Sequence, residues 1–144
     1  MRKFRPIAPA IALALALAAC GGGGSGQDPS PSPTLTTVPR PASTAELTIV
    51  VPEIGAVVHG STVDLRVDLQ GARIVPATTT QITPDEGHLH VILDDILISM
   101  TEGLRQSIPG VEPGLHRITV EFVASDHAPF DPRVVSVVAF EVEP

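Results

Sequence analysis

The clearest pattern in the chain is an alternation of apolar and polar residues between positions 62 and 69. The apolar positions are Val63, Leu65, Val67 and Leu69. The polar positions between them are Thr62, Asp64, Arg66 and Asp68. Because successive side chains of a strand point to opposite faces, this alternation predicts a half-buried strand over Thr62–Leu69. We find no apolar spacing of useful length that is typical of an amphipathic helix.

Shorter apolar or alternating runs, separated by Gly, Pro and Asp, predict further strands. We expect these strands at Glu46–Val51, Arg73–Val75, His88–Leu93, Ile96–Met100, Leu104–Ile108, Leu115–Ala124 and Val134–Val142. The last two runs are almost continuously apolar, which predicts central strands with well-buried positions. About seven short strands in about 100 residues indicate an all-β fold, an immunoglobulin-like (Ig-like) β-sandwich.

Two segments support this fold by resemblance. Residues 51–63, VPEIGAVVHGSTV, resemble the opening of many bacterial Ig-like domains. Residues 111–116, VEPGLH, resemble the Pro-Gly turn into strand F of fibronectin type III and related sandwiches, where an aromatic corner residue, usually tyrosine, follows. His116 occupies that corner position here. The resemblance therefore implies that His116 has a structural role, bonding to nearby backbone.

The first 44 residues differ in composition from the rest. A basic start (residues 1–5), a short apolar run (7–16) and small residues before Cys20 predict a signal peptide over residues 1–19. Leu17 to Cys20 resemble the bacterial lipobox, which implies that Cys20 is lipidated and begins the mature chain. That places the protein in the cell envelope, anchored by lipid to a membrane on its extracytoplasmic face. Residues 20–44, rich in Gly, Ser and Pro, predict a disordered linker, and residues 45–144 the sandwich domain.

Charge and missing motifs narrow the function further. The formal net charge is −7, and three basic residues leave with the signal peptide, so the mature chain is more acidic still. An acidic surface argues against nucleic acid as a partner. Cys20 is the only cysteine, so the domain contains no disulfide. There is no Gly-x-Ser-x-Gly motif and no phosphate-binding glycine loop before a helix, and we expect that the protein is not an enzyme.

Four of the five histidines lie in three short segments. These segments are Gly87-His88-Leu89-His90, Pro113-Gly114-Leu115-His116 and Asp126-His127. The set resembles uncharacterised secreted bacterial Ig-like domains that carry GHxH, PGxH and DH segments. This resemblance implies no particular activity.

Strand geometry brings some of these histidines together. His88 and His90 are two residues apart, so they share one face of their strand. In an Ig-like sandwich strands C and F are antiparallel neighbours, so the start of one lies beside the end of the other. One interpretation of this grouping is a small metal site of His88, His90 and His127, to which Asp126, Asp85 or Glu86 could add an oxygen ligand. Imidazole suits Cu(II), Zn(II) and Ni(II).

A simpler interpretation of the same segments involves no metal. On it, His88 and His90 are half-exposed strand residues, and Asp126 and His127 cap a loop. Two functions remain open. The first is a non-catalytic, membrane-tethered Ig-like module that binds or supports another envelope protein and holds no stoichiometric metal. The second is a lipoprotein that binds copper or zinc through the histidines at one end of the sandwich.

Overall fold

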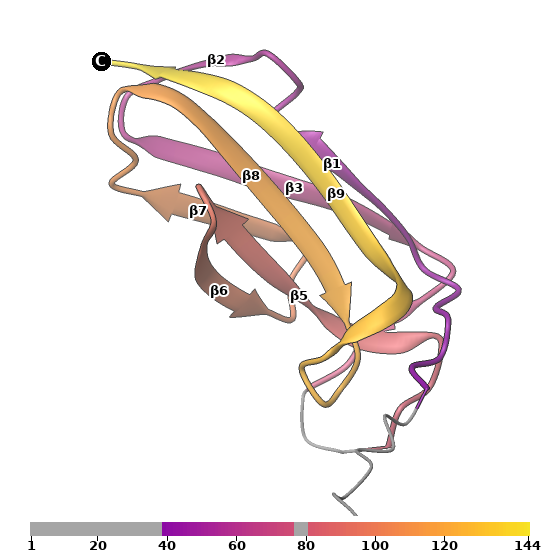
Figure 1. Cartoon of the computed structure of the whole chain (residues 1–144). Coiled ribbons are helices and arrows are strands. Elements are labelled where there is room, and N and C mark those ends of the chain that lie inside the picture. Colours follow the sequence, from indigo (N-terminus) through magenta and orange to yellow (C-terminus); the bar gives the residue numbers. More distant parts are fainter. Residues whose placement is uncertain (1–38, 77–80) are drawn as a thin grey trace, which may run out of the picture. The chain divides into compact units, whose positions relative to one another are not determined.

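The structure, a computed structural model, describes residues 39–76 and 81–144, which form two packed β-sheets (Figure 1). The predicted signal peptide, Cys20 and most of the predicted linker lie outside the described residues. Within the described ranges, no helix is long and apolar enough to cross a membrane.

The smaller sheet has three antiparallel strands in the order β1 (Glu46–Val51), β3 (Thr62–Gln70) and β7 (Arg105–Pro109). The larger sheet has the order β2 (Val57–His59), β9 (Pro129–Glu143), β8 (Gly114–Val123), β5 (Glu86–Leu93) and β4 (Arg73–Ile74). Strand β6 (Ile96–Thr101) also pairs with β5. This arrangement confirms the predicted all-β, Ig-like sandwich. Strand β2, with three residues, is too short to show an alternation and was not predicted.

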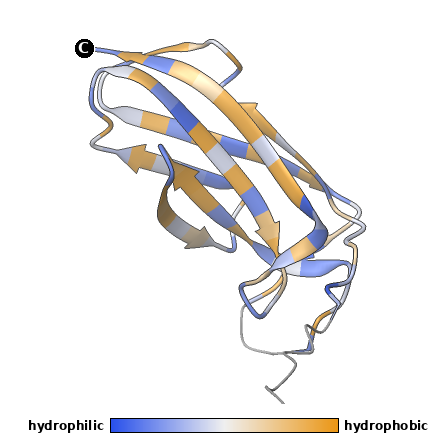
Figure 2. Cartoon of the chain, in the orientation of Figure 1, coloured by the Kyte–Doolittle hydropathy of each residue, from blue (hydrophilic) through white to orange (hydrophobic). Residues whose placement is uncertain are grey.

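The core lies between the two sheets and follows from the alternation in the sequence. On β3, Val63, Leu65 and Val67 are buried and the residues between them are exposed, and Figure 2 shows the same banding along the ribbon. The larger sheet supplies most of the remaining core, namely Leu89, Val91, Ile118, Val120, Phe122, Phe130, Val138, Phe140 and Val142. Because the domain has no disulfide, burial of these side chains is its main source of stability.

Strand β9 is central in its sheet, as predicted, but it is less buried than the apolar run indicated. Its residues alternate between buried and exposed positions, and Val135 and Val137 are 38% and 53% exposed. One face of β9 therefore packs on the core and the other meets solvent, as is common in antiparallel sheets. Strand β8 meets the prediction better, because its last four residues are all buried.

Contacts with the domain begin before the boundary predicted at residue 45. The Thr44 N–H donates a hydrogen bond to Pro84 O (3.1 Å), and the Thr44 hydroxyl donates to Gly71 O (2.6 Å). The Ser43 hydroxyl also donates to Pro84 O (2.7 Å), and Arg40 bonds to the loop between β8 and β9. The last residues of the predicted linker are therefore attached to the sandwich.

Candidate metal centre

The pairing of β5 with β8 determines where the histidines lie. These strands are antiparallel neighbours, with His88 opposite Val123 and His90 opposite Glu121. The start of β5 therefore lies at the end of β8, as the sequence predicted for strands C and F. The loop that follows β8 carries His127 back over this end of the sheet.

Gly87 allows the start of β5 to approach β8 closely. A Cβ atom at this position would lie 2.1 Å from the carbonyl oxygen of Val123 and 2.8 Å from the ring of Phe122. Both distances are far below a normal van der Waals contact. A glycine is therefore required directly before His88, which gives a physical reason for the Gly-His-Leu-His segment.

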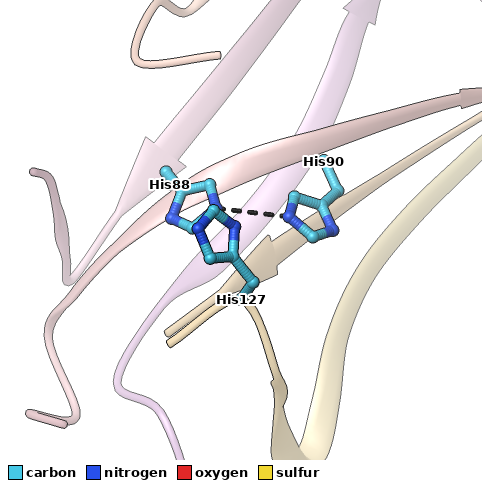
Figure 3. A group of neighbouring side chains, drawn as sticks. All are labelled: His88, His90 and His127. Carbon is cyan, nitrogen blue, oxygen red and sulfur yellow. Dashed lines mark hydrogen bonds between the residues drawn. The ribbon is translucent and has the colours of Figure 1, made fainter. Parts of the chain in front are cut away.

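The side chains of His88, His90 and His127 converge (Figure 3). His88 Nε2 lies 3.2 Å from His90 Nε2 and 3.0 Å from His127 Nδ1. One ring nitrogen from each of the three residues lies within 4.8 Å of the other two. The structure thus brings together the three histidines that the sequence grouped, which come from one strand and a loop almost forty residues later.

The three rings differ in exposure. His88 is only 2% exposed, His90 is half-buried and His127 is exposed. Burial, with smaller contributions from the charges of His127 and His90, lowers the pKa of His88 to about 4. Burial also lowers the pKa of His90. The simpler interpretation, with a half-exposed His88, is therefore wrong about this residue, and its burial favours the neutral form of the imidazole.

Two of the three separations between the nitrogens fit a small metal ion. Zn–N bonds of about 2.0–2.1 Å at tetrahedral angles place two ligand nitrogens about 3.3 Å apart. The two distances from His88 Nε2, 3.2 and 3.0 Å, are close to that value. Within the described residues, these three histidines are the group of three or more potential ligands whose donor atoms converge.

The carboxylates predicted as possible oxygen ligands do not join this group. Asp126 forms a two-pronged pair with Arg40, with N···O distances of 2.6 and 3.0 Å. Glu86 accepts hydrogen bonds from Arg73 and from the hydroxyl of Thr83. The donor atoms that converge are therefore all imidazole nitrogens, and the hydrogen bonds from Arg40 hold the pKa of Asp126 below its usual value.

Asp85 and Glu121 also lie near the histidines along the chain or across the strands. The Asp85 residue is exposed and is not part of the converging group. Glu121, opposite His90 on β8, is 5% exposed and accepts hydrogen bonds from both Nε and Nη2 of Arg133, each at 2.6 Å. Glu121 thus has its own cationic partner inside the domain.

Two buried side-chain polar atoms have no hydrogen-bond partner in the described part of the chain. They are His88 Nδ1 and Ser125 Oγ. A histidine that binds metal usually donates its other ring N–H to a carboxylate, a carbonyl or water. His88 would bind an ion through Nε2, so its Nδ1–H is the group for which an acceptor of this kind is expected.

His116 lies at the opposite end of β8, as predicted. Its Nε2 is 2.7 Å from the carbonyl oxygen of Glu112 and its Nδ1 is 2.7 Å from a carboxylate oxygen of Asp94. The bond to Glu112 is of the kind expected for a structural corner residue that bonds to nearby backbone. Because both partners are acceptors, this geometry favours a proton on each ring nitrogen. The hydrogen bond to Asp94 accordingly raises the pKa of His116.

Sequence reasoning missed Arg40 and Arg133, which hold the carboxylates around the histidines. Arg40 is 86 residues from Asp126, and it stands in a segment whose composition indicates a linker. No local pattern connects residues so far apart. Arg133 stands directly before the strand predicted at Val134–Val142, and only the pairing of β8 with β9 brings it to Glu121.

Comparisons with known proteins bear on the fold alone. No family model and no curated protein matches the sequence. The fibronectin(III)-like modules of Clostridium thermocellum CbhA are 21% identical, with 67% of this chain and 93% of that chain covered and a TM-score of 0.47. The PKD domain of human KIAA0319 is 16% identical, with 86% and 92% covered and a TM-score of 0.44.

A third similar structure is the endo-beta-1,4-mannanase from Thermotoga petrophila. It is 13% identical, with 69% of this chain but only 20% of the mannanase covered, and the TM-score is 0.46. The similarity therefore concerns a small part of that enzyme. The Ig-like fold of the present chain is compatible with a non-catalytic binding or structural module.

Proposed function

We propose that this domain is a non-catalytic module that binds one copper or zinc ion through His88, His90 and His127. The observation that carries the proposal is the convergence of three imidazole nitrogens, with those of His127 and His90 lying 3.0 and 3.2 Å from Nε2 of His88. Of the two functions left open by the sequence, this geometry favours metal binding over a module without metal.

The protonation of the site supports the same function. A metal ion needs neutral imidazoles, because a protonated ring nitrogen has no lone pair to donate. His88 is buried and its pKa is lowered to about 4, so the central ligand is neutral at physiological pH. No proton has to leave this ring before an ion binds.

The donor set supports transition metals over calcium or magnesium. Ca²⁺ and Mg²⁺ prefer oxygen ligands, whereas imidazole suits copper and zinc. The nearby carboxylates of Asp126, Glu86 and Glu121 are each bonded to an arginine. These arginines keep the oxygen atoms occupied and leave an all-nitrogen group.

We also propose that the chain is anchored to a membrane in the cell envelope by lipid on Cys20. This proposal rests on the resemblance of Leu17 to Cys20 to the lipobox and on the apolar run before it. The module then presents its metal on the extracytoplasmic side. We also propose that nucleic acid is not a partner, because the net charge of the chain is acidic.

Metal loading of the full chain tests the function. Metal-free protein is exposed to Cu(II) or Zn(II), freed of unbound ion and analysed for metal per chain. We expect about one ion per chain, and a large loss in His88→Ala/His90→Ala. Because His88 is buried, His127→Ala provides a second variant at an exposed ligand.

The matched control is His59→Ala, which removes an exposed histidine outside the cluster and should leave loading unchanged. Circular dichroism of each variant shows whether the sandwich remains folded. Equal metal content in the wild type, His127→Ala and the double variant would refute the proposed function.

A further inference from the structure

The loop that carries His127 is fastened by a residue near the start of the described chain. Arg40 donates four hydrogen bonds to this loop. They run from Nη1 to Asp126 Oδ2 (2.6 Å), from Nη2 to Asp126 Oδ1 (3.0 Å), from Nη2 to Ala128 O (2.9 Å) and from Nε to Pro129 O (2.8 Å). Arg40 therefore contacts the residues on both sides of His127.

The backbone of this loop needs such support. His127 has a φ of +62°, a left-handed conformation that residues other than glycine rarely adopt. Its N–H donates to the carbonyl of Ala124 (3.0 Å), and the Ala128 N–H donates to Asp126 Oδ1 (3.2 Å). The same carboxylate thus receives Arg40 and closes the turn around His127.

The ion pair between Arg40 and Asp126 is partly shielded from water. The two side chains are 25% and 26% exposed, and the pair uses both carboxylate oxygens. A two-pronged Arg–carboxylate pair fixes direction as well as distance. Of the three ligands, His88 and His90 are fixed by strand β5, whereas His127 depends on the loop that Arg40 holds.

We propose that Arg40 is a positioning residue for the metal site, holding His127 Nδ1 where an ion can join it to His88 and His90. This role rests on the proposed function. Arg40 does not itself touch the ion. Outer-shell partners that orient metal ligands typically change metal affinity by about 10–100-fold. By thermodynamic linkage, an ion that favours this loop position strengthens the attachment of Arg40 by the same factor.

The test is the zinc affinity of the full chain, measured by competition with a chelator of known affinity. We expect Arg40→Ala and Asp126→Ala each to weaken zinc binding roughly tenfold or more. Arg40→Lys keeps the charge but loses the planar fork, so its affinity should fall between wild type and Arg40→Ala.

The matched control is Arg117→Ala, which breaks an exposed ion pair with Asp95 at the far end of the domain. It should leave zinc affinity unchanged. Melting temperatures in the presence of a chelator separate a general loss of stability from a loss of affinity. If Arg40 had a purely structural role, its loss would lower the melting temperature and the zinc affinity together. A positioning role lowers the zinc affinity of variants that remain folded at the assay temperature.

Each remaining outcome has a defined meaning. Wild-type zinc affinity in Arg40→Ala would refute the positioning role while leaving the proposed function intact. Tighter binding in Arg40→Ala with weaker binding in Asp126→Ala would also refute it, because Asp126 would then be a ligand that Arg40 restrains. Failure of the wild type to bind zinc or copper would refute the proposed function and this role together.

Discussion

Replacement of Gly87 by alanine tests the close approach of β5 to β8. The added methyl carbon would start 2.1 Å from Val123 O, whereas ordinary contacts begin near 3.4 Å. The start of β5 would therefore have to move away by the difference, roughly 1.3 Å. Overpacking of this kind costs about 1–3 kcal/mol, and a strained or lost hydrogen bond to β8 adds about 1 kcal/mol.

We therefore expect Gly87→Ala to lower the free energy of unfolding by roughly 2–4 kcal/mol. In a domain of this size that corresponds to a fall in melting temperature on the order of 10–20 °C. Thermal unfolding followed by circular dichroism, with a chelator present, measures it. The zinc affinity of the folded variant should fall as well, because His88 is the next residue.

The matched control is Gly103→Ala, whose added methyl carbon would lie 3.5 Å from its nearest neighbours. This variant should stay within about 1 kcal/mol of the wild type. If Gly87→Ala melted within a few degrees of Gly103→Ala, the tight packing of β5 on β8 would be refuted as the reason for glycine at this position.

Two further predictions concern the other end of the domain and the anchor. Burial alone would raise the pKa of Asp94, but hydrogen bonds from His116 and Arg117 lower it, while Asp94 raises the pKa of His116. Their bond therefore stabilises the fold fully between the ordinary pKa values of Asp and His, about 4 and 6.5. This contribution is lost as the pH rises through the raised pKa of His116, or falls through the lowered pKa of Asp94. His116→Gln should lower the free energy of unfolding in urea by about 1 kcal/mol at pH 6 and by less at pH 9. Equal losses at the two pH values would contradict this dependence. Cys20→Ser should move the protein from the membrane fraction to the soluble fraction, and its retention on membranes would argue against a lipid anchor.

The sequence predicted the parts of the fold that depend on local alternation. Strand β1 and the alternating face of β3 were predicted correctly because apolar and polar residues there repeat with a period of two. The predicted strands His88–Leu93 and Ile96–Met100 leave Asp94 and Asp95 between them, and both residues adopt positive φ there. The exposure of one face of β9 was not predicted, because a run of apolar residues does not show which face of a strand the second sheet covers.

The candidate site was only partly predictable, for a different reason. His88 and His90 share a face by simple strand geometry, and antiparallel pairing brings His127 near them. The burial of His88 and the role of Arg40 depend on how a loop and a distant N-terminal segment pack. Those contacts arise from tertiary structure and leave no periodic signal in the sequence.

The alternation along β5 has a consequence for how fast the proposed metal site would take up an ion. Leu89 and Val91 point into the core, so His88 and His90 are fixed on the opposite face, and a register slip of one residue would exchange the two pairs. Packing of Leu89 and Val91 in the core therefore fixes the positions of His88 and His90 before an ion binds. His88 and His90 would therefore lose little conformational entropy when an ion binds. Uptake of copper or zinc should therefore follow simple second-order kinetics, without a slow rearrangement of the sandwich.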